Sequence, residues 1–199
     1  MHPIVDTQQR ILDSARELIY SRSYADVGVA AICEHAGVKK GSFYHFFPSK
    51  RDLTLAMLDA SYLGFKESLI AKAFAEDIPP MARIDRLGRL AYEFQQQVQK
   101  NTGLVLGCPF GNLSNELATQ DETIRIRIEH IFTNLQVSMR KVLREAVDAG
   151  DIANINIEAT AQAMLAYFEG VMLLAKSQNN TEILSQLMPA MSQIRINTI

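Results

Sequence analysis

Apolar residues recur with a helical period along almost the whole chain. They return every three to four positions, and no strand-like alternation continues for more than a few residues. The pattern predicts an all-α fold of about nine helices. The expected helices cover about residues 7–21, 29–36, 40–46, 51–74, 81–100, a short one from 108, and then 122–149, 157–177 and 181–196.

Residues 29–37 have the pattern of a short helix followed by a turn. Val29, Ile32, Cys33 and Ala36 are spaced i, i+3, i+4 and i+7, which places them on one inward face of a helix. Gly37 follows at the position where a helix commonly ends in a left-handed residue, a conformation that glycine adopts without steric cost. The chain is therefore expected to turn sharply at Gly37.

A second short helix, residues 40–46, combines inward aromatic rings with an outward polar face. Phe43 is expected to point inward together with Phe46 or Phe47. The outward positions hold side chains of the types that contact DNA phosphates and base edges, namely Lys39, Lys40, Ser42, Tyr44 and His45. The two helices therefore predict a helix-turn-helix that reads DNA. The alternative is ordinary helix packing, with the lysine pair on a solvated face.

The next helix is expected to begin with a capping box. Pro48 cannot extend the preceding helix, and Ser49 and Asp52 have the spacing of the box. Lys50 and Arg51 then lie in the first turn, where positive charge is unfavourable unless an anion is bound there. We expect that anion to be a DNA phosphate held by Lys50.

Two stretches of the chain resemble a known family. The string AGVKKGSFYHFFPSKRDL resembles the signature of TetR-family transcriptional regulators, and TQQRILDSARELIYSRSYADV resembles their first helix. The resemblance covers about residues 7–58. It implies an N-terminal three-helix helix-turn-helix DNA-binding domain, residues 1–50, and a C-terminal helical ligand-binding and dimerisation bundle, residues 51–199. It also implies a repressor that binds a palindromic double-stranded DNA operator as a homodimer and is released by a small-molecule inducer.

The resemblance assigns the DNA contacts to one short helix and the start of the next. The expected contacts are Lys39, Lys40, Gly41, Ser42, Tyr44 and His45, with Lys50 on a phosphate. Members of the family usually have a Ser or Thr pair and an arginine where the preceding helix begins. This chain has Val27, Gly28 and Ala30 there. The departure predicts weaker binding, or contact confined to the second helix, rather than loss of DNA binding.

The last two expected helices are apolar around more of their circumference than a single core contact requires. Such an excess favours a protein partner. The resemblance implies that these helices pair with their twins across a two-fold axis, and two reading helices must reach successive major grooves about 34–36 Å apart. The sequence therefore predicts a homodimer through the last two helices. The alternative is the buried core of a monomer.

Charge and composition exclude several classes of protein. The net charge of the 199 residues is -2, and residues 1–53 hold seven Lys or Arg against six Asp or Glu, which argues against a generally basic protein that coats nucleic acid. No run of about 18 apolar residues and no signal-peptide profile occurs, so a cytoplasmic protein without membrane association is expected. Two cysteines and four histidines lack the spacing of metal ligands, so neither a metal nor a cofactor is expected.

Cys108 is the most distinctive residue of the C-terminal part. Pro109 follows it and fits the first position of a helix, and a thiol at a helix N-terminus is favoured as the nucleophilic thiolate. The segment resembles a branch of TetR regulators that respond to electrophiles or oxidants through a cysteine at this point, with Lys176 as a positive neighbour. The alternative is that Cys108 is an inert packing residue.

Other candidates for a ligand pocket are polar or aromatic residues on otherwise apolar helices. The leading ones are Phe110, Asn112, His130 and Tyr167, and the wider set adds Tyr62, Tyr92, Gln95, Asn115, Glu116, Asn134 and Phe168. A helical-bundle enzyme that uses Cys108 with His130 is the rival interpretation. No residue that would orient the histidine can be located, so we expect no enzymatic activity. A non-specific architectural DNA protein fits the charge distribution poorly.

Overall fold

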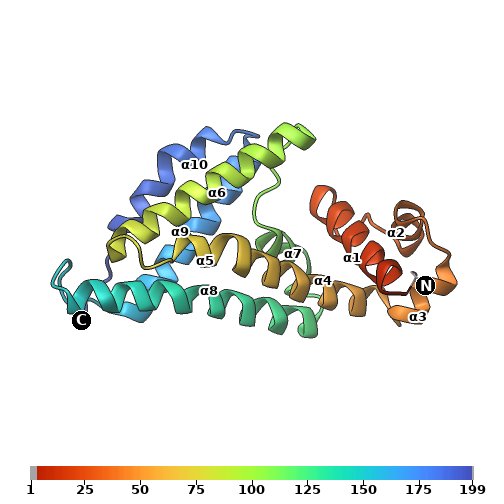
Figure 1. Ribbon diagram of the computed structural model, residues 1–199, viewed down its shortest axis with the longest axis horizontal. Helices are drawn as coiled ribbons and strands as arrows, with labels where there is room; N and C mark the ends of the chain where they lie inside the picture. The colour runs from red at the N-terminus through yellow and green to blue at the C-terminus, as the bar shows by residue number, and fades with distance from the viewer. Residues whose placement is uncertain (1–3, 199) are drawn as a thin grey trace. The chain divides into compact units, whose positions relative to one another are not determined.

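A computed structural model describes residues 4–198, and every regular element in that range is helical (Figure 1). Counting each unbroken run of helix once gives nine helical segments in residues 4–198, as the pattern predicts. In chain order the elements are α1 (Ile4–Ser21), α2 (Val29–Ala36), α3 (Lys40–Phe46), α4 (Lys50–Phe65), the π-helix η1 (Lys66–Ile70), α5 (Ala71–Ala73), α6 (Pro80–Thr102), α7 (Pro109–Leu117), α8 (Glu122–Asp148), α9 (Ile157–Ser177), α10 (Glu182–Leu187) and the 3₁₀-helix η2 (Met188–Gln193).

The predicted helix over residues 181–196 is the clearest difference from the structure. Helix α10 ends at Leu187, and the chain continues as the 3₁₀-helix η2 to Gln193 before it becomes extended at Ile194. Pro189 explains the change, because proline has no backbone N–H to donate and disfavours α-helical geometry in the residue before it. The long helix expected over residues 51–74 is present, with one π-helical turn inside it.

The chain forms two compact units. Of the residues that the structure describes, the first unit contains those up to Gly64 together with Pro109–Glu129, and the second contains Phe65–Cys108 and the residues from His130 onward. The structure therefore groups α7 and the first turns of α8 with the N-terminal helices. The division of the chain into two domains at residue 50 stays a prediction. In the first unit α1 packs against α2 and α3. Ile11 and Ala15 of α1, Ile32 of α2 and Phe43 of α3 are fully buried in this core.

The second unit is built on contacts between α6, α9, α10 and η2, and α10 lies beside α6 in the view of Figure 1. Gly88 of α6 lies close against η2, because a Cβ added there would lie 2.7 Å from the Cβ of Met188. Helix α9 starts with an N-cap: the side chain of Asn156 accepts the backbone N–H of Ala159 at 3.0 Å. Among the residues described, no helix is both long and apolar enough to span a membrane.

Candidate nucleic-acid interface

The turn between α2 and α3 has the geometry of a Schellman motif. Gly37 is left-handed with φ +63°, the N–H of Gly37 donates to Glu34 O at 3.1 Å, and the N–H of Val38 donates to Cys33 O at 2.9 Å. The guanidinium of Arg10 on α1 donates to the carbonyl of Ala36 and, at 3.3 Å, to that of Gly37. The turn predicted at Gly37 is therefore present, and α1 holds it from the side.

Helix α3 presents two different faces. Phe43 is completely buried, and Phe47 just after the helix is 4% exposed. The opposite face is open: Lys39, Lys40, Gly41, Tyr44 and His45 are exposed, and Ser42 is half-buried. Sequence reasoning left the choice between Phe46 and Phe47 open, and the structure places Phe47 in the core and Phe46 at its edge.

The start of α2 differs from the family pattern as the sequence indicated. Gly28 is the N-cap residue and has no side chain to bond the first turn, and Val27 before it is fully buried. The Ser or Thr pair that most family members have at this position would present hydroxyl groups to a DNA phosphate. The chain offers only backbone N–H groups here, so the polar side chains of the helix-turn-helix are concentrated on α3.

The start of α4 shows the N-cap half of the predicted capping box, and Asp52 accepts the Ser49 hydroxyl in place of the Ser49 backbone N–H. The N–H of Asp52 donates to Ser49 Oγ at 3.1 Å, and Ser49 Oγ donates to Asp52 Oδ2 at 2.6 Å. The two cations of the first turn have partners within the protein. Arg51 lies 3.7 Å from Asp121, while the ammonium of Lys50 donates to the carbonyl of Tyr24 and lies 3.7 Å from the centroid of its ring.

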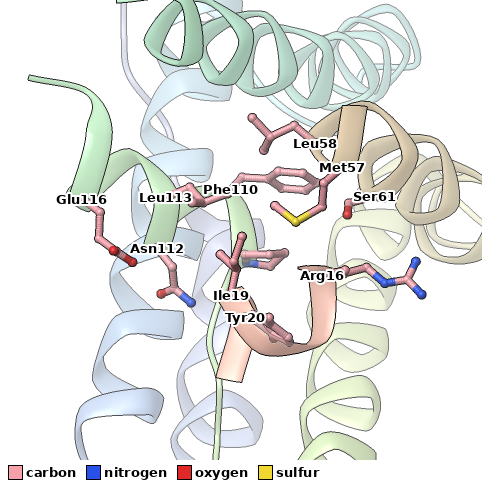
Figure 2. Close-up of a pocket in the computed structure, with 11 residues that line it drawn as sticks. Arg16, Ile19, Tyr20, Met57, Leu58, Ser61, Phe110, Asn112, Leu113 and Glu116 are labelled. Carbon is pink, nitrogen blue, oxygen red and sulfur yellow. The ribbon is translucent and has the colours of Figure 1, made fainter. Parts of the chain in front are cut away.

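Three of the predicted pocket residues, Phe110, Asn112 and Glu116, line a small cavity within the first unit. Side chains from three helices surround it, and Phe110 lies against Met57 and Leu58 (Figure 2). The complete lining is Arg16, Ile19 and Tyr20 of α1, Met57, Leu58 and Ser61 of α4, and Pro109, Phe110, Asn112, Leu113 and Glu116 of α7. Its volume of about 20 Å³ is room for about one water molecule, so it is not a ligand site in this conformation.

Cys108 lies directly before α7, as predicted, and is buried. Its thiol donates a hydrogen bond to the carboxyl group of Glu169 on α9, a residue that the sequence analysis did not single out. Burial raises the pKa of Glu169 to about 7, and the bond from Cys108 opposes part of that rise. Glu169 Oε1 is buried and accepts no hydrogen bond. A single acidic residue within the apolar run of α9 was the available signal.

The remaining predicted sensing residues, Tyr167, His130 and Lys176, do not line the cavity. Tyr167 donates its hydroxyl to Leu187 O at 2.8 Å, so its polar end serves the junction of α10 with η2. His130 on α8 and Lys176 on α9 are exposed. Across residues 4–198, no group of three or more His, Cys, Asp or Glu side chains is arranged to hold a metal ion.

Comparison with known proteins agrees with this arrangement of helices. Residues 11–57 match the bacterial regulatory proteins of the tetR family, and residues 83–191 match the tetracyclin repressor-like C-terminal domain. The first match contains the helix-turn-helix and the start of α4. The second begins within the first turn of α6 and extends through most of η2.

Similar proteins extend over most of the chain. Transcriptional regulator AcuR of Cereibacter sphaeroides is 31% identical over 84% of this chain and 75% of its own length. An uncharacterized HTH-type transcriptional regulator in the lacX 3' region of Lactococcus lactis is 29% identical over 90% of this chain and 88% of its own. The crystal structure of regulatory protein TetR from Rhodobacter sphaeroides superposes with a TM-score of 0.82 and 28% identity, covering 94% of this chain and 98% of that one. The chain therefore belongs to the TetR family of transcriptional regulators.

Proposed function

We propose that this TetR-family regulator binds a palindromic DNA operator as a homodimer, with α3 of each protomer in the major groove. The observation that carries the proposal is the open face of α3, where Lys39, Lys40, Tyr44 and His45 are exposed while Phe43 anchors the helix in the core. A short helix fixed by a buried ring and presenting cations and an aromatic hydroxyl suits the major groove.

The proposal divides the DNA contacts among the residues of this face and Lys50. Lys39 and Lys40 contact phosphates, and Tyr44 and His45 contact base edges or the backbone. Gly41 lets the α3 backbone come close to DNA, and Ser42 adds a hydroxyl. Lys50 holds a phosphate with the N–H groups that its bond to Tyr24 O leaves over, since an ammonium group carries three.

The proposed dimer uses the exposed face of α9 together with α10 and η2. Ala166, Gly170, Leu173 and Leu174 are exposed at helical spacing, and nothing lies within 4 Å of a Cβ added at Gly170. Small residues beside leucines allow two helix backbones to approach closely and bury apolar surface. A symmetric pair places two copies of α3 on successive major grooves.

Binding of a small molecule in the C-terminal bundle then shifts the dimer to a state whose two α3 helices no longer match the grooves, and the operator is released. We assign the protein to repression, the role most usual in the family, and to the cytoplasm, where a bacterial chromosome lies.

One selection experiment tests the proposal. The protein is used to select duplexes from a random library, and an inverted repeat with half-sites about 10 base pairs apart, bound by two protomers, is expected. Leu174→Glu should give a monomer in sedimentation and lose operator binding. Leu104→Glu is the matched control, because Leu104 is 48% exposed and Leu174 is 46% exposed. A monomeric parent, or selection of no preferred sequence, contradicts the proposal.

Release through a thiol is a second candidate, favoured by the position of Cys108 directly before α7. The operator complex is treated with N-ethylmaleimide, and Cys108→Ser is expected to resist release. The control is Cys33→Ser. Cys33 is buried in α2 of the helix-turn-helix, and its alkylation would also disrupt DNA binding. Equal release from the parent and Cys108→Ser contradicts a sensor at this thiol.

A further inference from the structure

The loop between α1 and α2 is held by a residue far along the chain. Glu116 Oε2 on α7 accepts the backbone N–H of Tyr24 at 2.8 Å and lies 3.4 Å from the N–H of Ala25. These two residues lie in the loop that leads from α1 into the helix-turn-helix. A backbone N–H that is partly buried needs an acceptor, and a carboxylate is a stronger acceptor than a neutral group. Glu116 therefore fixes the conformation of this loop.

Lys50 binds the same residue, Tyr24, through its carbonyl group and its ring. The ammonium donates to Tyr24 O and lies 3.7 Å from the centroid of the Tyr24 ring. The N–H and the C=O of one residue are thus bound by two side chains of opposite charge, one on α7 and one at the start of α4. Burial lowers the pKa of Lys50, and the negative charge of Glu116 opposes that change. Glu116 therefore acts on Lys50 both through the loop and through its charge.

We propose that Glu116 is a positioning residue for DNA binding, which through Tyr24 places the ammonium of Lys50 for a phosphate. The inference rests on the proposed function, because it assigns Lys50 to the operator. It adds a way for α7 to control DNA binding by the helix-turn-helix. Glu116 lies on the same helix as Phe110, Asn112 and Leu113, which line the cavity (Figure 2), and Cys108 immediately precedes that helix. A shift of α7 withdraws the acceptor from Tyr24 and misplaces Lys50.

The test uses three variants of the full chain and a duplex that the parent selects from a random library. Glu116→Ala removes the acceptor, while Glu116→Gln keeps an acceptor oxygen and removes the charge. Glu122→Ala is the matched control, because Glu122 is exposed at the start of α8 and its removal changes the net charge by the same amount.

Glu116→Ala is expected to weaken operator binding about 10-fold and to reduce the salt slope of binding by about one unit, as when one phosphate contact is lost. Glu116→Gln should stay within about 3-fold of the parent, since an amide oxygen also accepts the N–H of Tyr24. A merely structural role for Glu116 would leave the salt slope unchanged. The inference is overturned if Glu116→Ala and Glu122→Ala bind alike, or if Glu116→Gln is as weak as Glu116→Ala.

A double-mutant cycle and an amide readout complete the design. In a Lys50→Met background, Glu116→Ala should weaken binding less than about 2-fold further, because the contact it positions is already gone. Without DNA, exchange of the Tyr24 amide hydrogen should be about 10-fold faster in Glu116→Ala than in the parent or Glu116→Gln. Unchanged exchange shows that Glu116 does not hold Tyr24 and overturns the inference. A parent that selects no sequence but shows the amide effect contradicts the proposed function, while the bond from Tyr24 to Glu116 is confirmed.

Discussion

Phe43 and Tyr44 are consecutive residues of α3 with opposite surroundings. Phe43 is completely buried, whereas Tyr44 is 54% exposed, and their ring centroids are 5.2 Å apart at an interplanar angle of 78°. One residue fastens the helix to the core, and the next extends from it toward solvent. This division separates the packing role of Phe43 from the DNA contact that we propose for Tyr44.

Substitution of each ring by alanine should separate the two properties. Phe43→Ala should lower the free energy of unfolding by about 3–5 kcal/mol, because it leaves a cavity in the core formed by α1, α2 and α3. Tyr44→Ala should change that free energy by less than about 0.5 kcal/mol and weaken binding to the selected duplex at least about 5-fold. Urea unfolding and fluorescence anisotropy measure the two effects. Tight binding by a folded Tyr44→Ala would remove Tyr44 from the interface.

Gly41 offers a test of close backbone approach to DNA. Nothing in the protein lies within 4 Å of a Cβ added at Gly41, so Gly41→Ala should fold and gain up to about 1 kcal/mol of helix stability. The same methyl group should meet the DNA backbone and weaken operator binding about 10-fold or more. Gly64→Ala is the control, because a Cβ at this glycine of α4 also meets nothing within 4 Å. Equal affinities of the two variants would place DNA away from Gly41.

The packing of α6 on η2 depends on Gly88. A Cβ at this position would lie 2.7 Å from the Cβ of Met188, and a Cβ cannot rotate away as the end of a side chain can. Gly88→Ala should therefore lower the free energy of unfolding by about 1–3 kcal/mol, although alanine is the better helix former. Thermal and urea unfolding test this against Gly64→Ala, which should be neutral or stabilising. A stable Gly88→Ala would show that η2 yields easily.

Glu169 should make stability depend on pH. Its pKa in the folded chain is about 7, raised by burial from 4.5, so the folded state holds this proton more tightly than the unfolded state does. The free energy of unfolding should therefore fall as the pH rises from about 4.5 to 7, by at most about 3 kcal/mol, and the loss is complete above pH 7. Stability is greatest, for this group, below pH 4.5.

Glu169→Gln should remove this part of the pH dependence, because an amide does not ionise. Urea unfolding of the parent and the variant at pH 5 and pH 8 gives the difference directly. Glu93→Gln, at an exposed position of α6, serves as the control for loss of a carboxylate. If the parent and Glu169→Gln lose equal stability between the two pH values, the carboxyl group is ionised at no cost and is better solvated than its surroundings indicate.

The sequence predicted the helix-turn-helix closely because its signals are local. Gly37 ends a helix by its backbone freedom, Ser49 and Asp52 start one by mutual capping, and the spacing of Phe43 sets which face of α3 is buried. Each of these depends on residues a few positions apart. Even the boundary of α10 follows from Pro189, although helical periodicity continues past it.

Contacts between distant segments could not be read from the chain. The bond from Tyr24 to Glu116 joins residues separated by 92 positions, and the bond between Cys108 and Glu169 also joins residues far apart in the chain. No local pattern encodes either pair. Lys50 shows the same limit: its charge in the first turn of α4 was noted, but its partner at Tyr24 O comes from the fold. His130 was a pocket candidate chosen by residue type alone, and the fold leaves it exposed.

Affinity of the folded dimer for its selected operator, as a function of salt, tests the central claim most directly. The comparison is between the parent and a Lys39→Ala, Lys40→Ala, Tyr44→Ala triple variant, whose three side chains are exposed. The variant should keep its fold and dimer, bind at least about 100-fold more weakly, and show a salt slope smaller by about two units per protomer. A folded, dimeric variant that binds the operator with the affinity and salt slope of the parent would contradict the placement of α3 in the groove.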